Sequence, residues 1–208
     1  MPTPSFERDL MRRELRARRR ELSTAERSLA CTRFARVARS TRLFRPGRRI
    51  ALYVAHGGEA DPSALLQLAR SLHCTVHLPV IASHRDCRMG FVPYEPGDRL
   101  APNRYGIPEP VARRAPALVR SLDVIIVPLV AVDLCGTRLG SGAGFYDRAL
   151  RHLCRARHWR RPKLIGLAYQ FQLVERIPRR PWDVPLDAIL TDKALYRARR
   201  SPTQQEVP

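Results

Sequence analysis

The stretch from Asp133 to Leu150 reads DLCGTRLGSGAGFYDRAL and combines glycines with arginine and aspartate, a set of residues typical of a ligand-binding or catalytic loop. It contains four glycines: Gly136, Gly140, Gly142 and Gly144. Glycine-rich turns that lead into a helix expose backbone N–H groups, and such groups bind phosphate. Arg138 adds a permanent charge with a planar fork of donors, and Asp147 could hold an accompanying cation. The stretch predicts an anion cradle, although a glycine-rich turn that only packs tightly would look the same.

The elements on either side must position this stretch. Before it, Leu122 to Val132 is an apolar, β-branched run typical of a strand buried on both faces. Further strands are predicted at 49–55, 75–81, 89–93, 163–169 and 186–190. Helices are predicted at 5–21, after the capping box that starts at Ser23, from Asp61 to about 72, and from Phe145 to about 157. Strands that alternate with helices predict an α/β fold with a doubly wound, largely parallel sheet and helices on both faces.

Loops that follow the carboxyl ends of such strands bind ligands. The loop His56–Glu59 follows the first predicted strand, so we expect it at the same edge as the glycine-rich stretch. Glu59 is therefore a candidate site residue, although a loop glutamate is more often only solvated. Residues 103–110 hold too much proline and glycine for regular structure, and a loop of this length is typical of a functional segment.

The length of 208 residues suits one domain over residues 1–200, followed by a disordered tail at 201–208. The five cysteines are scattered and form no CxxC pair, which indicates reduced thiols in a cytoplasmic protein. Neither a membrane-spanning run nor a targeting segment is expected.

The formal charge of +19 comes almost entirely from arginine, and it implies attraction to anions. A nucleic-acid-binding protein is therefore an alternative, supported by the arginine-rich N-terminal helix. Arginine is spread over the whole chain, which favours a compositional origin instead. Arg8 and Arg12 stand four residues apart and share one helix face, and without further information a solvated face explains them.

The motif GTRLGSGAGFYDR, Gly136 to Arg148, resembles the GxRLGxGxGYYD signature of the 5-formyltetrahydrofolate cyclo-ligase family, also called methenyltetrahydrofolate synthetase. Other motifs follow in the family's order: Glu59 after the first strand, LPV at 78–80, YGIPEP at 105–110 and IGLAY at 165–169. The resemblance spans roughly residues 8–192. It implies a doubly wound α/β fold and the conversion of 5-formyltetrahydrofolate and MgATP into 5,10-methenyltetrahydrofolate, ADP and phosphate.

The resemblance also implies roles for individual residues. ATP would contact Arg8, Arg12, Gly136, Arg138, Leu139, Gly140, Ser141, Gly142, Ala143 and Gly144, and Arg138 would act on the transferring phosphoryl group. Asp147 and Asp183 match magnesium ligands. Glu59 matches a residue that hydrogen-bonds the pterin, and Phe145 and Tyr146 match an aromatic pair near the folate.

The chain departs from the family pattern at Ala143, at Phe145, where tyrosine is usual, and at Trp182. These departures bear on efficiency and substrate preference more than on the reaction. The implied partners are two small molecules, 5-formyltetrahydrofolate and ATP, with no specific nucleic acid and no membrane, and the oligomeric state is open. An inactive, folate-binding paralogue remains a second alternative.

Overall fold

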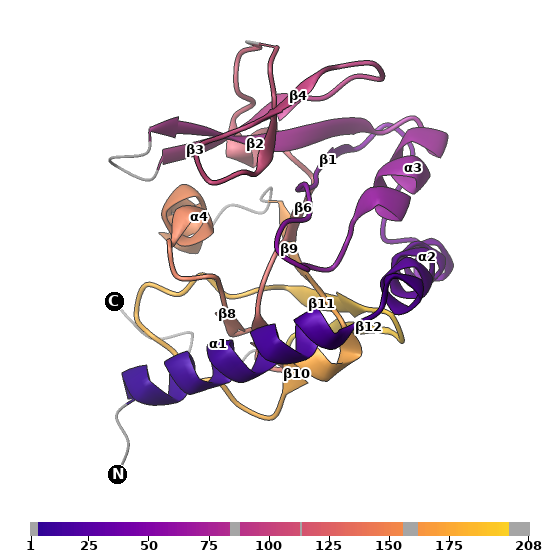
Figure 1. Cartoon of the computed structure of the whole chain (residues 1–208). Coiled ribbons are helices and arrows are strands. Elements are labelled where there is room, and N and C mark those ends of the chain that lie inside the picture. The colour runs from indigo at the N-terminus through magenta and orange to yellow at the C-terminus, as the bar shows by residue number, and fades with distance from the viewer. Residues whose placement is uncertain (1–3, 84–87, 113, 156–161, 200–208) are drawn as a thin grey trace.

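The computed structural model describes residues 4–83, 88–112, 114–155 and 162–199. Its centre is a seven-stranded sheet (Figure 1). In spatial order the strands are β12 (Leu195–Arg197), β11 (Ala188–Thr191), β9 (Lys163–Ala168), β6 (Val124–Val127), β1 (Arg49–Ala51), β2 (Thr75–Ser83) and β3 (Arg88–Pro93). Only the edge strands β3 and β12 run antiparallel to their neighbours. The predicted doubly wound, largely parallel sheet is thereby confirmed.

Helices cover both faces of this sheet. Helices α2 (Thr24–Ser40) and α3 (Ser63–Ser71) lie on one face, and α4 (Phe145–Arg155) lies on the other. The structure also has α1 (Pro4–Glu21), which covers neither face, and short 3-10 turns at Val119–Ser121 and Gln170–Gln172. The predicted capping box opens α2: the Ser23 N–H donates to Glu26 at 2.8 Å, and the Glu26 N–H donates to Ser23 Oγ at 3.2 Å. The sequence predicts Asp61 as the N-cap of α3, but Pro62 occupies that position, so the predicted start is one residue too early. None of the helices among the described residues is long and apolar enough to cross a membrane.

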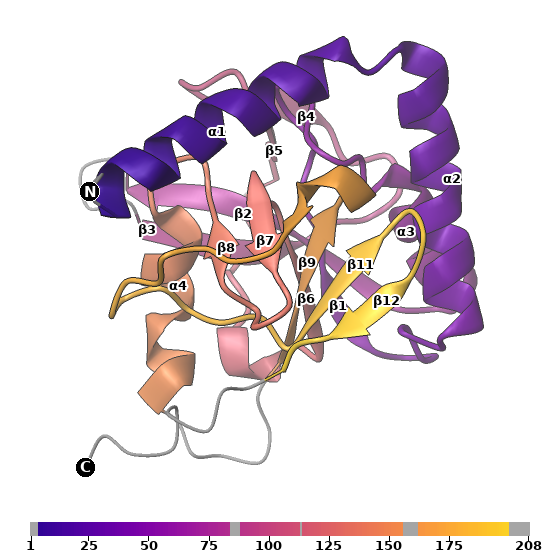
Figure 2. The same cartoon turned by 90° about the horizontal axis from the view of Figure 1, so that it is seen from below.

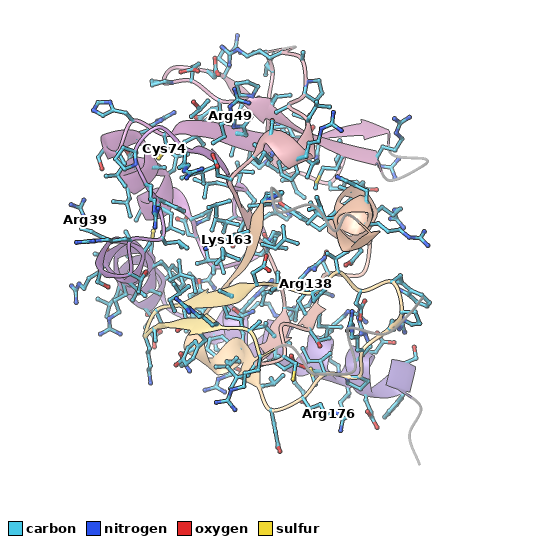
Figure 3. All side chains as sticks on the ribbon, turned by 180° about the vertical axis from the view of Figure 1, so that it is seen from behind. Arg39, Arg49, Cys74, Arg138, Lys163 and Arg176 are labelled. Atoms are coloured by element: carbon cyan, nitrogen blue, oxygen red, sulfur yellow. The ribbon has the colours of Figure 1, made fainter. Side chains whose placement is uncertain are left out.

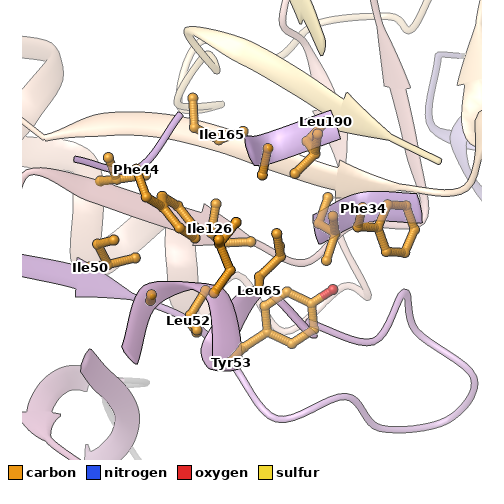
Figure 4. Close-up of a cluster of buried hydrophobic side chains, with 14 of the residues drawn as sticks. Phe34, Phe44, Ile50, Leu52, Tyr53, Leu65, Ile126, Ile165 and Leu190 are labelled. Atoms are coloured by element: carbon orange, nitrogen blue, oxygen red, sulfur yellow. The ribbon is translucent and has the colours of Figure 1, made fainter. Parts of the chain in front are cut away.

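Alternation along the strands divides the core into two layers. Ile50, Leu52 and Ile126 face α2 and α3, where they pack with Phe34 and Leu65 (Figure 4). Their neighbours Ala51, Ile125 and Val127 point to the other face and pack with Leu150 and Leu153 of α4. A sheet buried on both faces explains why the central strands are continuous apolar runs. Helix α1 lies across one end of the sheet (Figure 2).

The prediction of one strand over Leu122–Val132 was wrong. The run divides into β6 and β7 (Ala131–Asp133), separated by a segment that begins at Pro128, and proline cannot donate to a strand ladder. Strand β7 belongs to a second sheet of order β10-β7-β8, with β10 at Leu173–Val174 and β8 at Arg138–Leu139. The stretch from Asp133 to Leu150 therefore forms a β7–β8 hairpin, a glycine loop and the start of α4, rather than one turn between a strand and a helix.

Residues 103–110 are also more regular than predicted. Strands β4 (Leu100–Pro102) and β5 (Pro108–Pro110) form an antiparallel hairpin. The Asn103 side chain shapes its turn, because Oδ1 accepts the N–H groups of Tyr105 at 2.8 Å and Ile107 at 3.1 Å. The sequence prediction also missed β12 and made β1 too long. The predicted end of α4 near 157 and the tail at 201–208 lie outside the described residues, and the single-domain division stays a prediction.

Candidate functional site

A cavity of about 140 Å³ opens at the carboxyl ends of β1 and β6. Several loops contribute to its lining: Tyr53, Val54 and Glu59 after β1; Pro128 and Leu129 after β6; Asn103, Ile107 and Glu109 of the β4–β5 hairpin; Gly140, Ser141, Ala143 and Gly144 of the glycine loop; and Arg138, Phe145, Tyr146 and Asp147. The loop that contains Glu59 and the glycine loop therefore meet at one edge, as expected for this sheet.

Arg138 is the fixed cation of this cavity. It projects from β8, its side chain is only 3 % exposed, and Nη2 lies 2.6 Å from Asp147 Oδ1. Nη1 donates to the carbonyl of Val184, and the Val184 N–H donates to the same Asp147 oxygen at 3.3 Å. Figure 3 shows Arg138 inside the molecule, whereas Arg39 extends outward from α2. The planar guanidinium is thus held in one orientation.

Asp183 lies next to Val184 in the chain, so the structure brings it to the same segment that Asp147 contacts. Its carboxylate is buried and accepts Arg8 Nη1 at 2.7 Å and the Arg180 N–H at 2.9 Å. Arg8 also donates to the Pro178 carbonyl at 2.6 Å. In this structure Arg8 is therefore a buried partner of Asp183, not a residue of a solvated helix face.

Helix α1 holds the glycine loop. Arg12 Nε donates to the Gly140 carbonyl at 3.0 Å, and Arg16 Nη2 donates to the Ser141 carbonyl at 2.8 Å. Sequence reasoning missed Arg16, and it also missed Arg19, which is buried against the loops behind the cavity. The signal was present as a continuation of the Arg8 and Arg12 spacing along one helix face.

Five residues predicted to contact ATP are not part of the cavity lining: Arg8 and Arg12 of α1, and Gly136, Leu139 and Gly142. Gly136 forms the turn between β7 and β8 with φ +80°, and a Cβ there would lie 2.5 Å from the Leu186 carbonyl. Leu139 is fully buried beside Leu15 of α1. Gly142 belongs to the glycine loop and has open space around it. The lining includes the other four members of the loop.

Glu59 reaches the cavity from the loop after β1. Burial raises the pKa of its carboxyl group, and the N–H of His56, 3.3 Å from Oε2, and the charge of Arg19 oppose that rise. The Glu59 carbonyl also accepts the hydroxyl of Tyr169 at 3.4 Å. The backbone of the loop is therefore held in place, and the carboxyl group of Glu59 lines the cavity.

Phe145 and Tyr146 begin α4 and supply aromatic walls. Phe145 meets Tyr105 of the hairpin edge to face with ring centroids 6.0 Å apart, and Tyr146 meets Phe91 at 6.4 Å. The Tyr146 hydroxyl is buried and has no hydrogen-bond partner among the described residues. Burial also raises the pKa of this hydroxyl, so it stays a neutral donor.

Sequence reasoning also missed a third carboxylate in the cavity, beside those of Glu59 and Asp147. Glu109 Oε1 accepts Asn103 Nδ2 at 2.8 Å and the Ile81 N–H at 3.1 Å. The YGIPEP motif contains this glutamate, but nothing in the motif places it in the same cavity as Glu59. Among the described residues no group of three or more His, Cys, Asp or Glu side chains is arranged to hold a metal ion. A cation here would need ligands from a bound substrate beside Asp147 or Asp183.

The sheet and its cavity at the carboxyl ends of the strands place the chain among α/β proteins that bind small molecules at this edge. A model of the 5-formyltetrahydrofolate cyclo-ligase family matches residues 4–192. The chain therefore belongs to this family and is an enzyme, which confirms the resemblance found in its motifs.

Individual relatives agree with the family. The chain is 40 % identical to the 5-formyltetrahydrofolate cyclo-ligase of Haemophilus influenzae over 149 residues, which cover 70 % of this chain and 76 % of the relative. The Escherichia coli K12 enzyme of the same name is 37 % identical over 150 residues, or 71 % of this chain and 79 % of the relative. The solved structure of Aquifex aeolicus 5,10-methenyltetrahydrofolate synthetase superimposes with a TM-score of 0.77 at 30 % identity and covers 97 % of this chain and 96 % of its own.

Proposed function

We propose that this enzyme converts 5-formyltetrahydrofolate and MgATP into 5,10-methenyltetrahydrofolate, ADP and phosphate. The observation that carries the proposal is the position of Arg138, a buried cation between the glycine loop and a cavity lined by Glu59 and aromatic rings. One side of the cavity suits phosphate groups, and the other suits a flat heterocycle. The names of the relatives support the substrate and the product.

The reaction must turn a formyl oxygen into a leaving group. The formyl oxygen attacks the terminal phosphorus of ATP, ADP leaves, and an iminium-like phosphate ester remains. The second folate nitrogen then attacks the formyl carbon, a carbon–nitrogen bond forms, and the carbon–oxygen bond breaks as phosphate departs. That nitrogen loses its proton, which leaves the methenyl bridge. No protein nucleophile is needed, so positioning and charge stabilisation supply the catalysis.

Arg138 would stabilise the charge that develops on the transferring phosphoryl group. Its guanidinium is already held by Asp147 and by the Val184 carbonyl, so little reorganisation is required when that charge appears. The N–H groups of the glycine loop would bind the phosphates, and Arg12 would hold the loop from α1 through Gly140. Arg8 would reach the nucleotide only by leaving Asp183.

Magnesium would be held by Asp147, with Asp183 beside it. The donor set fits, because carboxylate oxygens are the ligands that magnesium prefers, with phosphates and water completing the shell. Asp147 lines the cavity and keeps one oxygen outside its bond to Arg138, whereas Asp183 is occupied by Arg8 and the Arg180 N–H. When bound, the ion would neutralise phosphate charge.

The folate head group would occupy the other side of the cavity. Glu59 would accept its N–H donors, and Phe145 and Tyr146 would contact the ring faces and edges. Because both ends of the cavity share the start of α4, the reacting oxygen and the terminal phosphate would come together near Arg138.

The test is direct incubation of the purified enzyme with 5-formyltetrahydrofolate and MgATP. We expect the absorbance of the methenyl product to rise together with ADP, with one ADP formed per product, and neither signal when ATP is omitted. Binding of 5-formyltetrahydrofolate without turnover would instead identify an inactive paralogue. If no methenyl product forms, and the protein binds nucleic acid in a salt-dependent way that is unaffected by ATP, the nucleic-acid alternative would be favoured.

A further inference from the structure

Arg19 is a buried charge that the proposed mechanism does not use. It lies near the end of α1 and is only 5 % exposed. Its Nη2 donates to the Gly57 carbonyl at 2.8 Å, and its Nη1 lies 3.5 Å from the Leu129 carbonyl. Its Nε is buried and has no partner among the described residues.

Burial of a charged group costs free energy unless a partner compensates for it. An arginine cannot avoid that cost by losing its proton under ordinary conditions. Desolvation lowers the pKa of Arg19, and the charge of Glu59 is the largest effect that opposes this. Glu59 shows the complementary effect, because burial raises the pKa of its carboxyl group and Arg19 lowers it. Arg19 and the partly buried Glu59 therefore stabilise each other in their charged forms.

The two carbonyls that Arg19 contacts belong to two different loops, and each loop contributes a residue to the cavity lining. Gly57 lies in the loop that carries Glu59, and Leu129 lies in the segment after β6. Leu129 and Glu59 both line the cavity. One guanidinium therefore ties α1 to both of the loops that carry these lining residues.

We propose that Arg19 is a positioning residue for recognition of the folate head group. It fixes the Glu59 loop through the Gly57 carbonyl, and its charge keeps the Glu59 carboxylate ionised inside the cavity. An ionised carboxylate accepts two adjacent N–H donors, the pattern that the aminopyrimidine edge of a pterin presents. The assignment of the ligand rests on the proposed function, whereas the coupling of Arg19 to Glu59 does not.

Several other groups also face Glu59. They are Arg16 of α1, His56 of its own loop, Tyr53 after β1 and Tyr146 of α4. Arg16 and a protonated His56 lower the pKa of Glu59, as Arg19 does. Arg19 has the largest effect among the charged side chains, so its removal should give the largest change.

The experiment compares Arg19→Met with Arg20→Met. Arg20 is exposed on the same helix, and its side chain donates no hydrogen bond among the described residues, so its variant is a matched control. The protein is labelled with ¹³C at its glutamate carboxyl groups, and Glu59→Gln identifies the Glu59 signal. We expect Glu59 to titrate at higher pH in Arg19→Met than in the parent or in Arg20→Met.

Substrate measurements follow on the same proteins. We expect Arg19→Met to bind 5-formyltetrahydrofolate about tenfold more weakly without ATP, while KM for ATP changes by less than about twofold. In Arg19→Met, the acidic limb of the pH profile of kcat/KM for 5-formyltetrahydrofolate should move to higher pH than in the parent. A purely structural role for Arg19 would lower stability without moving that limb.

Arg19→Lys keeps the charge and removes the planar fork, and it decides the matter if Arg19→Met does not fold. We expect its Glu59 titration to stay near that of the parent while 5-formyltetrahydrofolate binding weakens. An unchanged Glu59 titration in Arg19→Met, or unchanged 5-formyltetrahydrofolate binding in both variants, would overturn the proposal. If the parent forms no methenyl product, the proposed function fails, and the carboxyl titration still decides the coupling of Arg19 to Glu59.

Discussion

Arg138 and Asp147 form an ion pair of 2.6 Å, and each also bonds to the main chain of Val184. The arginine donates to the Val184 carbonyl, and the aspartate accepts the Val184 N–H. Strand β8 and the start of α4, which are close in the sequence, are joined here to the distant loop that contains Asp183. The geometry of the proposed phosphate-binding side of the cavity therefore depends on a few contacts that can be tested one by one.

Arg138→Ala should lower kcat by about 10²–10³, the loss typical of removing a donor aimed at developing charge. The exposed Arg151 of α4 gives the control, Arg151→Ala, which we expect to keep the parent's kcat. Steady-state kinetics separate kcat from KM, and urea denaturation reports the stability lost when Asp147 is left unpaired. A variant that raised only KM for ATP would show that Arg138 binds the ground state alone.

Asp147→Asn and Asp183→Asn should each abolish turnover and leave 5-formyltetrahydrofolate binding largely unchanged. They should differ in stability. Asp183 is a buried partner of Arg8, and breaking a buried ion pair costs about 3–5 kcal/mol, whereas the Asp147 side chain is 27 % exposed and should cost less. Turnover at several magnesium concentrations and urea denaturation measure both effects. Full activity in either variant would remove that residue from the mechanism.

The parts of this molecule that local patterns determine could be predicted from the sequence. The capping box at Ser23 depends on two residues three positions apart. The alternation of strands and helices along the chain predicts a largely parallel sheet. The break at Pro128 was harder to predict, because the apolar residues continue on both sides of it and only the pairing partner changes.

The neighbours of the site residues could not be predicted in the same way. An arginine on a helix is normally solvated, and Arg19 is buried only because α1 lies across the loops behind the cavity. The contact between Asp147 and Val184 joins residues 37 positions apart, and no local rule fixes such a pair. Family resemblance indicated the residues, but their pairing depends on the tertiary fold.

Gly136→Ala should destabilise the enzyme more than Gly47→Ala. Both glycines have φ near +75°, where an alanine is strained by about 1–3 kcal/mol. A Cβ at Gly47 meets nothing within 4 Å, whereas one at Gly136 lies 2.5 Å from the Leu186 carbonyl. Overlap with backbone should add about 1–3 kcal/mol. Equal urea midpoints for the two variants would show that the β7–β8 turn can move away from Leu186.

Glu59→Gln should stabilise the free enzyme at neutral pH. Burial raises the pKa of Glu59 in the folded state, so folding favours the protonated carboxyl group, and the ionised group costs stability above that pKa. The advantage of the variant over the parent should shrink as the pH falls below the folded pKa. Urea denaturation at neutral and acidic pH tests this, with the exposed Glu14→Gln as control. An advantage that stayed constant with pH would contradict the raised pKa.

Tyr146→Phe should weaken 5-formyltetrahydrofolate binding without destabilising the free enzyme. The Tyr146 hydroxyl is buried and has no partner among the described residues, and an unsatisfied buried polar group costs about 1–3 kcal/mol. Phenylalanine keeps the ring that meets Phe91 and removes that cost. If the hydroxyl donates to bound 5-formyltetrahydrofolate, the variant should bind it about fivefold more weakly, because a net hydrogen bond contributes about 1 kcal/mol.

Tyr53→Phe is the matched control for this prediction. Tyr53 lines the same cavity, but its buried hydroxyl already donates to the Ala60 carbonyl. Its removal should lower the free energy of unfolding by about 1 kcal/mol or more, because the carbonyl loses its donor. Urea denaturation and calorimetric titration of 5-formyltetrahydrofolate on both variants complete the test. If Tyr146→Phe loses as much stability as Tyr53→Phe, the Tyr146 hydroxyl is already bonded in the free enzyme. If its affinity for 5-formyltetrahydrofolate is unchanged, that hydroxyl does not meet the substrate.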